Sequence, residues 1–111
     1  MTKQPEPLIG AAYDSLSITV DRIGKNKQAF LDDAVLQDAI LMRLLEAGEY
    51  LARVRDSYSD YYEEYSTDAW NNLIGLRNII AHGYLQVDRG KVWEIVQKEV
   101  PALVTELHEL I

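Results

Sequence analysis

Hydrophobic side chains recur at three- and four-residue steps along most of this chain of 111 residues. That spacing places them on one face of an α-helix, whereas a half-buried strand would show strict alternation, which is absent. Leu16, Val20 and Ile23 predict a first helix over roughly residues 7–23, and Gly24 is placed to end it. The opening part of the chain therefore predicts an amphipathic helix.

The longest predicted helix runs from Asp33 to about Ser57. Its apolar positions follow helical steps at Leu36, Ile40, Leu44, Ala47, Leu51 and Val54. The apolar face is widened further by Leu41, Met42 and Leu45. A face this wide predicts burial on more than one side. The helix is therefore either the centre of a bundle or a contact surface for a second chain.

Capping and helix-breaking residues place two more helices in the C-terminal half. Thr67 or Asp68 is placed to cap the first of them, and Gly83 to end it. Asp88 is placed to cap the last helix, which Pro101 interrupts. The pattern predicts an all-α fold, an up-and-down bundle of four to five helices.

Length and composition narrow the class of protein. A chain of this length fits a single domain, residues 1–111, with its own core. It contains no cysteine, which excludes disulfides and thiolate zinc sites. No apolar run reaches about 18 residues, and the N-terminus lacks the layout of a secretory signal. We therefore expect a cytoplasmic protein that does not enter a membrane.

The chain is acidic, with 11 basic and 18 acidic residues and a net charge of −7. It is a poor match to proteins that bind nucleic acid through overall positive charge, so RNA binding would need a local basic cluster. The acidic stretch 56–68 carries four tyrosines and predicts a loop holding a short helical turn. Its tyrosines could stack on unpaired bases. Packing on the bundle or on a partner chain is the alternative we favour.

The segment RNIIAHGY carries the candidate chemistry. Arg77 and His82 lie roughly 140° apart around an ideal helix, so they do not share one face, although the chain can turn at Gly83. A histidine can take a proton from one oxygen and deliver one to another. An arginine offers a permanent forked donor set to a phosphate, and Asn78 could orient either group. Such a pair can promote attack of an RNA 2′-OH on its own phosphodiester without a metal or other cofactor.

The spacing alone also fits commoner roles. A histidine at a helix end often caps carbonyl groups, and an arginine within a helix often forms an ordinary salt bridge. Arg43, on the long helix, is a second phosphate-binding candidate with the same alternative. His108, among polar residues near the C-terminus, is treated as structural or solvated.

Three blocks of sequence carry a family pattern. Arg77, His82 and Tyr84 form the motif Arg-x4-His-x-Tyr, with Asn78 directly after the arginine. VWEIVQKEVPAL follows it, and QDAI…RLLEAGEY precedes it in the long helix. In all three blocks, and over nearly its whole length, the chain resembles the HepT-like branch of the HEPN superfamily, whose members are small all-α toxins.

The resemblance implies a metal-independent endoribonuclease that needs no cofactor. Arg77 and His82 would be the catalytic pair, and Asn78 would support them. It also implies a homodimer whose two motifs line one cleft, which removes the need for both side chains to share a helix face. The family partner is a minimal nucleotidyltransferase antitoxin, as in a type VII-like toxin–antitoxin pair. That partner can transfer AMP to the motif tyrosine, here Tyr84, and such AMPylation would block RNA by charge and bulk.

Two other classes of function fit the same residues. The chain could be a non-catalytic nucleotide- or partner-binding subunit of a nucleotidyltransferase, using the motif to hold a phosphate without cutting. It could also be a plain helical dimerisation module, which would bind neither nucleotide nor RNA. Toxicity on expression separates the nuclease from both alternatives, because only the nuclease should stop growth.

Overall fold

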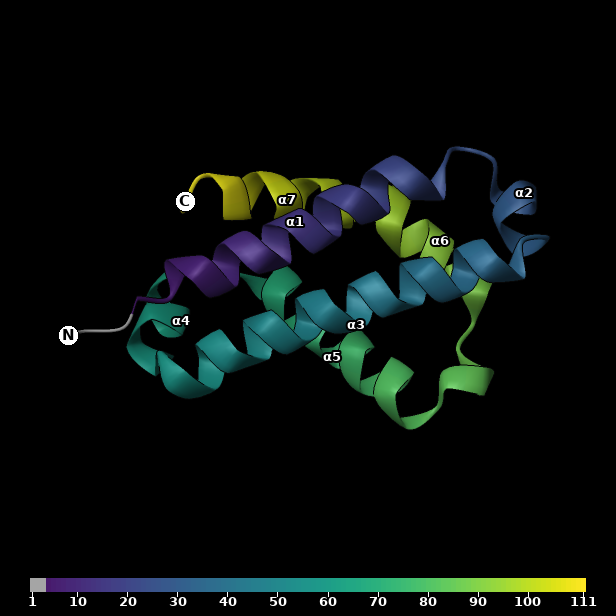
Figure 1. The fold of residues 1–111 in the computed structure, drawn as a ribbon. Helices are drawn as coiled ribbons and strands as arrows, with labels where there is room; N and C mark the ends of the chain where they lie inside the picture. The colour runs from purple at the N-terminus through teal and green to yellow at the C-terminus, as the bar shows by residue number, and fades with distance from the viewer. Residues whose placement is uncertain (1–3) are drawn as a thin grey trace.

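Four helical rods run up and down beside one another in the computed structural model, which describes residues 4–111 (Figure 1). The rods are α1 (Glu6–Ile23), α3 (Ala34–Ser57), α5 (Asp68–His82), and α6 (Arg89–Lys98) followed by α7 (Val100–His108). Shorter helices, α2 (Lys27–Leu31), α4 (Ser59–Tyr65) and the 3-10 turn η1 (Tyr84–Gln86), lie in the connections. No strand occurs in the described range. The predicted all-α bundle, HEPN-like in its helical arrangement, is confirmed.

Side-chain caps begin three of the helices. The carboxylate of Asp33 accepts a hydrogen bond from the backbone N–H of Leu36 at 2.9 Å, at the start of α3. Asn26 and Asp88 cap α2 and α6 in the same way. Each cap satisfies an amide that has no partner inside its helix. The residue at which each of these three helices begins is therefore set by the local sequence.

Asp33→Ala is expected to destabilise the protein by about 1 kcal/mol, because α3 loses the acceptor for its first-turn amide. Urea unfolding followed by circular dichroism measures this. Asp32→Ala is the matched control, since Asp32 is also exposed and, among residues 4–111, its side chain bonds only the side chain of Gln28. Equal midpoints for the two variants would contradict the capping role.

Gly24 and Gly83 end their helices as predicted, without the left-handed helical conformation common at such ends, and the predicted cap by Thr67 is not made. Gly24 ends α1 with φ 76° and ψ 175°, which is not the left-handed helical conformation. Gly83 ends α5 with φ −151°, so no positive φ is used there. Thr67 precedes α5 without capping it, and its hydroxyl donates instead to Glu106 at 2.9 Å. The helices end where expected, but tertiary contacts choose the local geometry.

The long helix α3 is the centre of the bundle, with α1 packed along it and α5 along it in turn (Figure 1). Ile40, Leu41, Leu44 and Leu51 are fully buried. The prediction of burial on more than one side is therefore confirmed. Met42 is the exception, because 55% of its surface is exposed.

The tyrosine-rich segment is a true helix, α4, rather than a loop with a turn. Tyr62 is buried, and its ring meets Trp70 edge to face at 5.6 Å. Tyr61 packs partly against the core, while the ring of Tyr65 lies tilted against that of Tyr61 and stays 44% exposed. Packing on the bundle is thus the main role of these rings in the described chain.

Pro101 separates the last rod into α6 and α7. It lies in the first turn of α7, where the missing N–H leaves no helical bond unmade. Within residues 4–111, no helix is both long and apolar enough to span a bilayer.

Candidate active site

The helices α3 and α5 approach closely where Gly48 faces Arg77. A Cβ at position 48 would overlap the Cβ of Arg77 and lie 2.9 Å from its Cγ and 3.2 Å from the carbonyl oxygen of Leu73. Only glycine leaves room for this approach. The stem of Arg77 therefore starts between two helices, and its side chain is 28% exposed.

Gly48→Ala is expected to destabilise the protein by about 1–3 kcal/mol, because the added methyl overfills a tight helix contact. It should also lower any activity that depends on Arg77, whose stem must shift. Urea unfolding tests the first effect. Gly75→Ala is the control on α5, since a Cβ there meets nothing within 4 Å. A Gly48→Ala protein as stable as the control would contradict the close approach.

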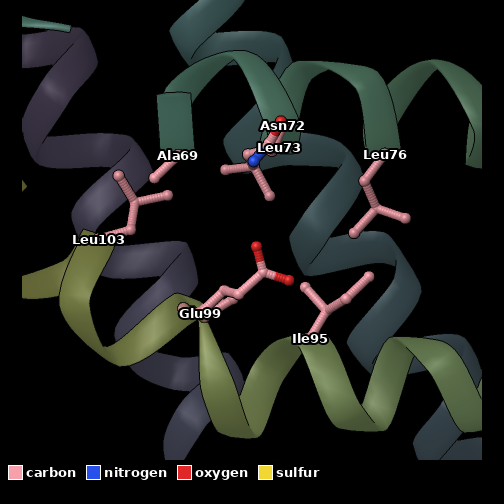
Figure 2. Close-up of a pocket in the computed structure, with 8 residues that line it drawn as sticks. Ala69, Asn72, Leu73, Leu76, Ile95, Glu99 and Leu103 are labelled. Carbon is pink, nitrogen blue, oxygen red and sulfur yellow. The ribbon is translucent and has the colours of Figure 1, made fainter. Parts of the chain in front are cut away.

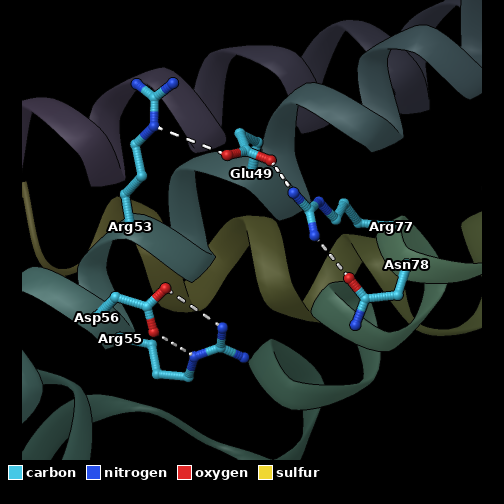
Figure 3. Close-up of polar contacts among 6 residues, drawn as sticks. All are labelled: Glu49, Arg53, Arg55, Asp56, Arg77 and Asn78. Atoms are coloured by element: carbon cyan, nitrogen blue, oxygen red, sulfur yellow. Dashed lines mark hydrogen bonds and ion pairs between the residues drawn. The ribbon is translucent and has the colours of Figure 1, made fainter. Parts of the chain in front are cut away.

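Two groups hold the guanidinium of Arg77 (Figure 3). Its Nη2 donates to a carboxylate oxygen of Glu49 on α3, and its Nη1 donates to Oδ1 of Asn78 at 2.7 Å. The other oxygen of Glu49 lies 3.9 Å from Nε of Arg53. Arg77 Nε is buried and has no hydrogen-bond partner among residues 4–111. A carboxylate thus lies between two guanidinium groups at the surface of the bundle.

His82 is the last residue of α5, and its side chain is exposed. Together with Gly83 and the η1 turn it borders an open hollow on the surface. No hydrogen bond or ion pair joins His82 to Arg77 within the part of the chain described here. The two motif residues therefore occupy separate positions in the described chain, in keeping with the prediction that they do not share one helix face.

Tyr84 ties the turn that follows His82 to α3. Its hydroxyl donates to Oδ1 of Asp38, and the guanidinium carbon of Arg89 lies 5.2 Å from its ring centroid. The hydrogen bond to Asp38 raises the pKa of Tyr84, and burial and the charge of Asp38 act in the same direction. The phenol thus holds its proton and directs it at α3.

Arg43 lies apart from these contacts. Its Nη1 is 3.6 Å from a carboxylate oxygen of Glu46, which also accepts a hydrogen bond from Ser15 of α1 at 3.1 Å. This cluster links α3 to α1, whereas Arg77 belongs to the contact between α3 and α5. The structure therefore brings Asn78 to Arg77 and does not bring Arg43 there.

A small apolar cavity of about 50 Å³ opens elsewhere, between α5 and the break that separates α6 from α7. Leu73, Leu76 and Ile95 line it, and the carboxylate of Glu99 points into it (Figure 2). None of the predicted site residues borders it. The candidate chemistry thus lies on the surface formed by α3, the end of α5 and η1.

A family model described as Ribonuclease HepT-like matches residues 13–110, nearly the whole chain. The chain belongs to the HepT-like ribonuclease family. The matched range includes every predicted site residue of this HepT-like chain.

Similar proteins carry ribonuclease names. Putative RNase TTE0752 of Caldanaerobacter subterraneus subsp. tengcongensis is 26% identical over 98% of the HepT-like chain and 96% of its own. Putative RNase MJ1380 of Methanocaldococcus jannaschii is 28% identical over 90% and 86%. Gamma-glutamylcyclotransferase and putative RNase MJ0434, from the same organism, is 30% identical over 75% of this chain but only 36% of its own length. No solved structure gives a significant match.

The site of the HepT-like chain contains α3 residues that sequence reasoning did not single out. Asp38 and Glu49 contact Tyr84 and Arg77 respectively. The two acids are eleven residues apart, which is close to three helical turns and places them on one stripe of α3. The spacing of the two acids shows in the sequence that they share one face of α3, but nothing in the sequence says which helix that face meets.

Proposed function

We propose that this chain is the toxin of a type VII-like toxin–antitoxin pair and acts in the cytoplasm as a metal-independent endoribonuclease. The observation that carries the proposal is the exposed imidazole of His82 at the end of the helix that also holds the Arg77 guanidinium. Membership of a ribonuclease family supports RNA as the substrate. Proton transfer and phosphate stabilisation are the two functions that this cleavage needs.

The proposed reaction is attack of a ribose 2′-OH on the adjacent phosphodiester. His82 takes the proton from the 2′-oxygen as that oxygen bonds to phosphorus. The 5′-oxygen then leaves, and a protonated His82 gives it a proton. The products are a 2′,3′-cyclic phosphate and a 5′-OH end. Arg77 stabilises the charge that builds up on the phosphate, and Asn78 orients Arg77 through the bond to its Nη1.

A homodimer would supply both motifs to one cleft. Support comes from apolar side chains that are exposed beside the candidate site: Val35 at 80%, Met42 at 55% and Ile79 at 60%. Val35 and Met42 lie on the same stripe of α3 as Glu49, within roughly 40° around the helix. Covering these side chains with a second copy would bury apolar surface and double the number of arginines at the site.

A nucleotidyltransferase antitoxin would control the site through Tyr84. The tyrosine is 36% exposed and lies two residues after His82, so an adenylate on its hydroxyl would add bulk and negative charge beside the imidazole. Modification requires the hydroxyl to leave Asp38, and the carboxylate would then repel the new phosphate. The modified side chain would therefore point away from α3, toward the space that RNA must enter.

Incubation of total RNA and tRNA with the purified protein in excess EDTA tests the proposal. We expect cleavage that leaves 2′,3′-cyclic phosphate ends. A folded dimer, made without its antitoxin, that leaves all of these RNAs intact would overturn the nuclease and support the non-catalytic binding subunit. Wild-type expression that does not slow growth would also count against the nuclease and favour the binding subunit.

A further inference from the structure

Glu49 contacts Arg77, the motif side chain whose forked donors suit a phosphate. We propose that Glu49 is a positioning residue, which sets the guanidinium of Arg77 in the orientation that stabilises the reacting RNA phosphate. The inference rests on the proposed ribonuclease function and adds a residue of α3 to it. Glu49 does not touch the substrate in this proposal and acts through Arg77.

The geometry fixes the guanidinium at two of its three nitrogens. A carboxylate oxygen of Glu49, on α3, accepts a hydrogen bond from Nη2. Oδ1 of Asn78, on α5, accepts one from Nη1. Each terminal nitrogen carries two hydrogens, so each keeps one N–H that neither neighbour uses. The side chain is therefore held from two helices while donors remain for a phosphate.

The stem of Arg77 is constrained as well. Gly48, next to Glu49, allows α3 to lie against the Cβ and Cγ of Arg77. The Nε of Arg77 is buried at this contact. Consecutive residues of α3 thus fix both ends of the same side chain, the stem by close contact and the head by a charge-assisted bond.

Charge also favours this arrangement over simple neutralisation of Arg77. Glu49 lies between Arg77 and Arg53, whose Nε is 3.9 Å from the second carboxylate oxygen of Glu49. Two positive charges and one negative charge leave a net charge of +1 at the cluster. A phosphate therefore still meets a positive surface, although Arg77 itself is paired. Donors that are already oriented stabilise a transition state better than donors that must be ordered during the reaction.

The opposite role would be an inhibitory contact, in which the carboxylate of Glu49 competes with the RNA phosphate for Arg77. The two roles predict opposite changes in rate. If Glu49 positions Arg77, removing its charge lowers the rate of cleavage. If Glu49 is an inhibitory contact, removing its charge raises that rate. Glu49→Gln distinguishes them, since it keeps the shape of the side chain and weakens only its bonds to the neighbouring guanidinium groups.

The kinetic test measures kcat and KM for a short RNA with Glu49→Gln. We expect kcat to fall about 10- to 100-fold with little change in KM, because a small misplacement of a catalytic group costs up to about a hundredfold. Glu46→Gln is the matched control on α3, since Glu46 pairs with Arg43 and not with Arg77. A Glu49→Gln rate equal to or above that of the wild type would overturn the inference.

A double-mutant cycle with Arg77→Lys tests whether Glu49 acts through Arg77. Lysine keeps the charge but has no fork to orient. Glu49→Gln should therefore cost little further activity in the Arg77→Lys background. Losses that multiply would mean that Glu49 acts independently of Arg77, and would also overturn the inference.

Side-chain ¹⁵N NMR of Arg77 keeps the inference separate from the nuclease proposal. We expect restricted rotation of the guanidinium in the wild type and in Glu46→Gln, and averaged signals in Glu49→Gln. If the wild type cuts no RNA but this pattern holds, the nuclease proposal fails and the positioning role stands. If Glu49→Gln leaves the signals unchanged, the positioning role fails even where RNA is cut.

Discussion

His82→Ala is expected to lower RNA cleavage by about 10²- to 10⁴-fold, the usual contribution of a positioned general acid–base group. The substitution removes the group that takes the 2′-OH proton and supplies one to the leaving oxygen. Stability should change little, because the side chain is exposed at the end of α5. Single-turnover cleavage of a defined RNA in EDTA measures the loss.

His108→Ala is the control for this prediction, since it removes the only other histidine of the chain. His108 lies near the C-terminus, at the end of α7, with its ring 5.3 Å from that of Tyr13. We expect this variant to cut RNA at the wild-type rate. Expression in cells gives a second readout, because His82→Ala should relieve the growth arrest that the wild type causes. A His82→Ala protein that still cleaves at the wild-type rate would remove His82 from the mechanism.

Arg77→Ala is expected to lower kcat/KM by about 10²- to 10³-fold, the cost of removing a donor aimed at developing charge. The charges of the neighbouring side chains give an electrostatic reason for this loss. Without Arg77, the charges of Arg53 and Glu49 cancel, and the local net charge falls from +1 to zero. RNA would then meet a neutral cluster on a chain that is acidic overall. Steady-state kinetics at two salt concentrations measure both the loss and its electrostatic part.

Two further variants distinguish a defined phosphate contact from a general effect of charge. Arg77→Lys keeps the charge and loses the fork, so it should recover only part of the activity. Arg55→Ala removes another arginine, on α3, whose partner is the neighbouring Asp56 at 2.9 Å, and it should leave cleavage unchanged. Equal losses for Arg77→Ala and Arg55→Ala would show that overall charge, rather than a defined phosphate contact, governs the reaction.

Most of the helices, and the order of the candidate residues, can be read from the local sequence; the tyrosine-rich helix α4 is the exception. Asp33, Asn26 and Asp88 cap helices through bonds to amides three residues away, so the information is local. The apolar steps of α3 are equally local, because a helix turns by a constant angle per residue. The motif spacing also predicted that Arg77 and His82 do not share one helix face.

The groups that surround those residues depend instead on how the helices pack. Glu49 meets Arg77, and Asp38 meets Tyr84, because α3 and α5 are antiparallel and in one particular register. Gly48 sets how closely they approach, and Met42 stays exposed because no neighbouring helix of the described chain covers it. Periodicity tells which residues share a face, but the partner of that face depends on how all the helices pack together.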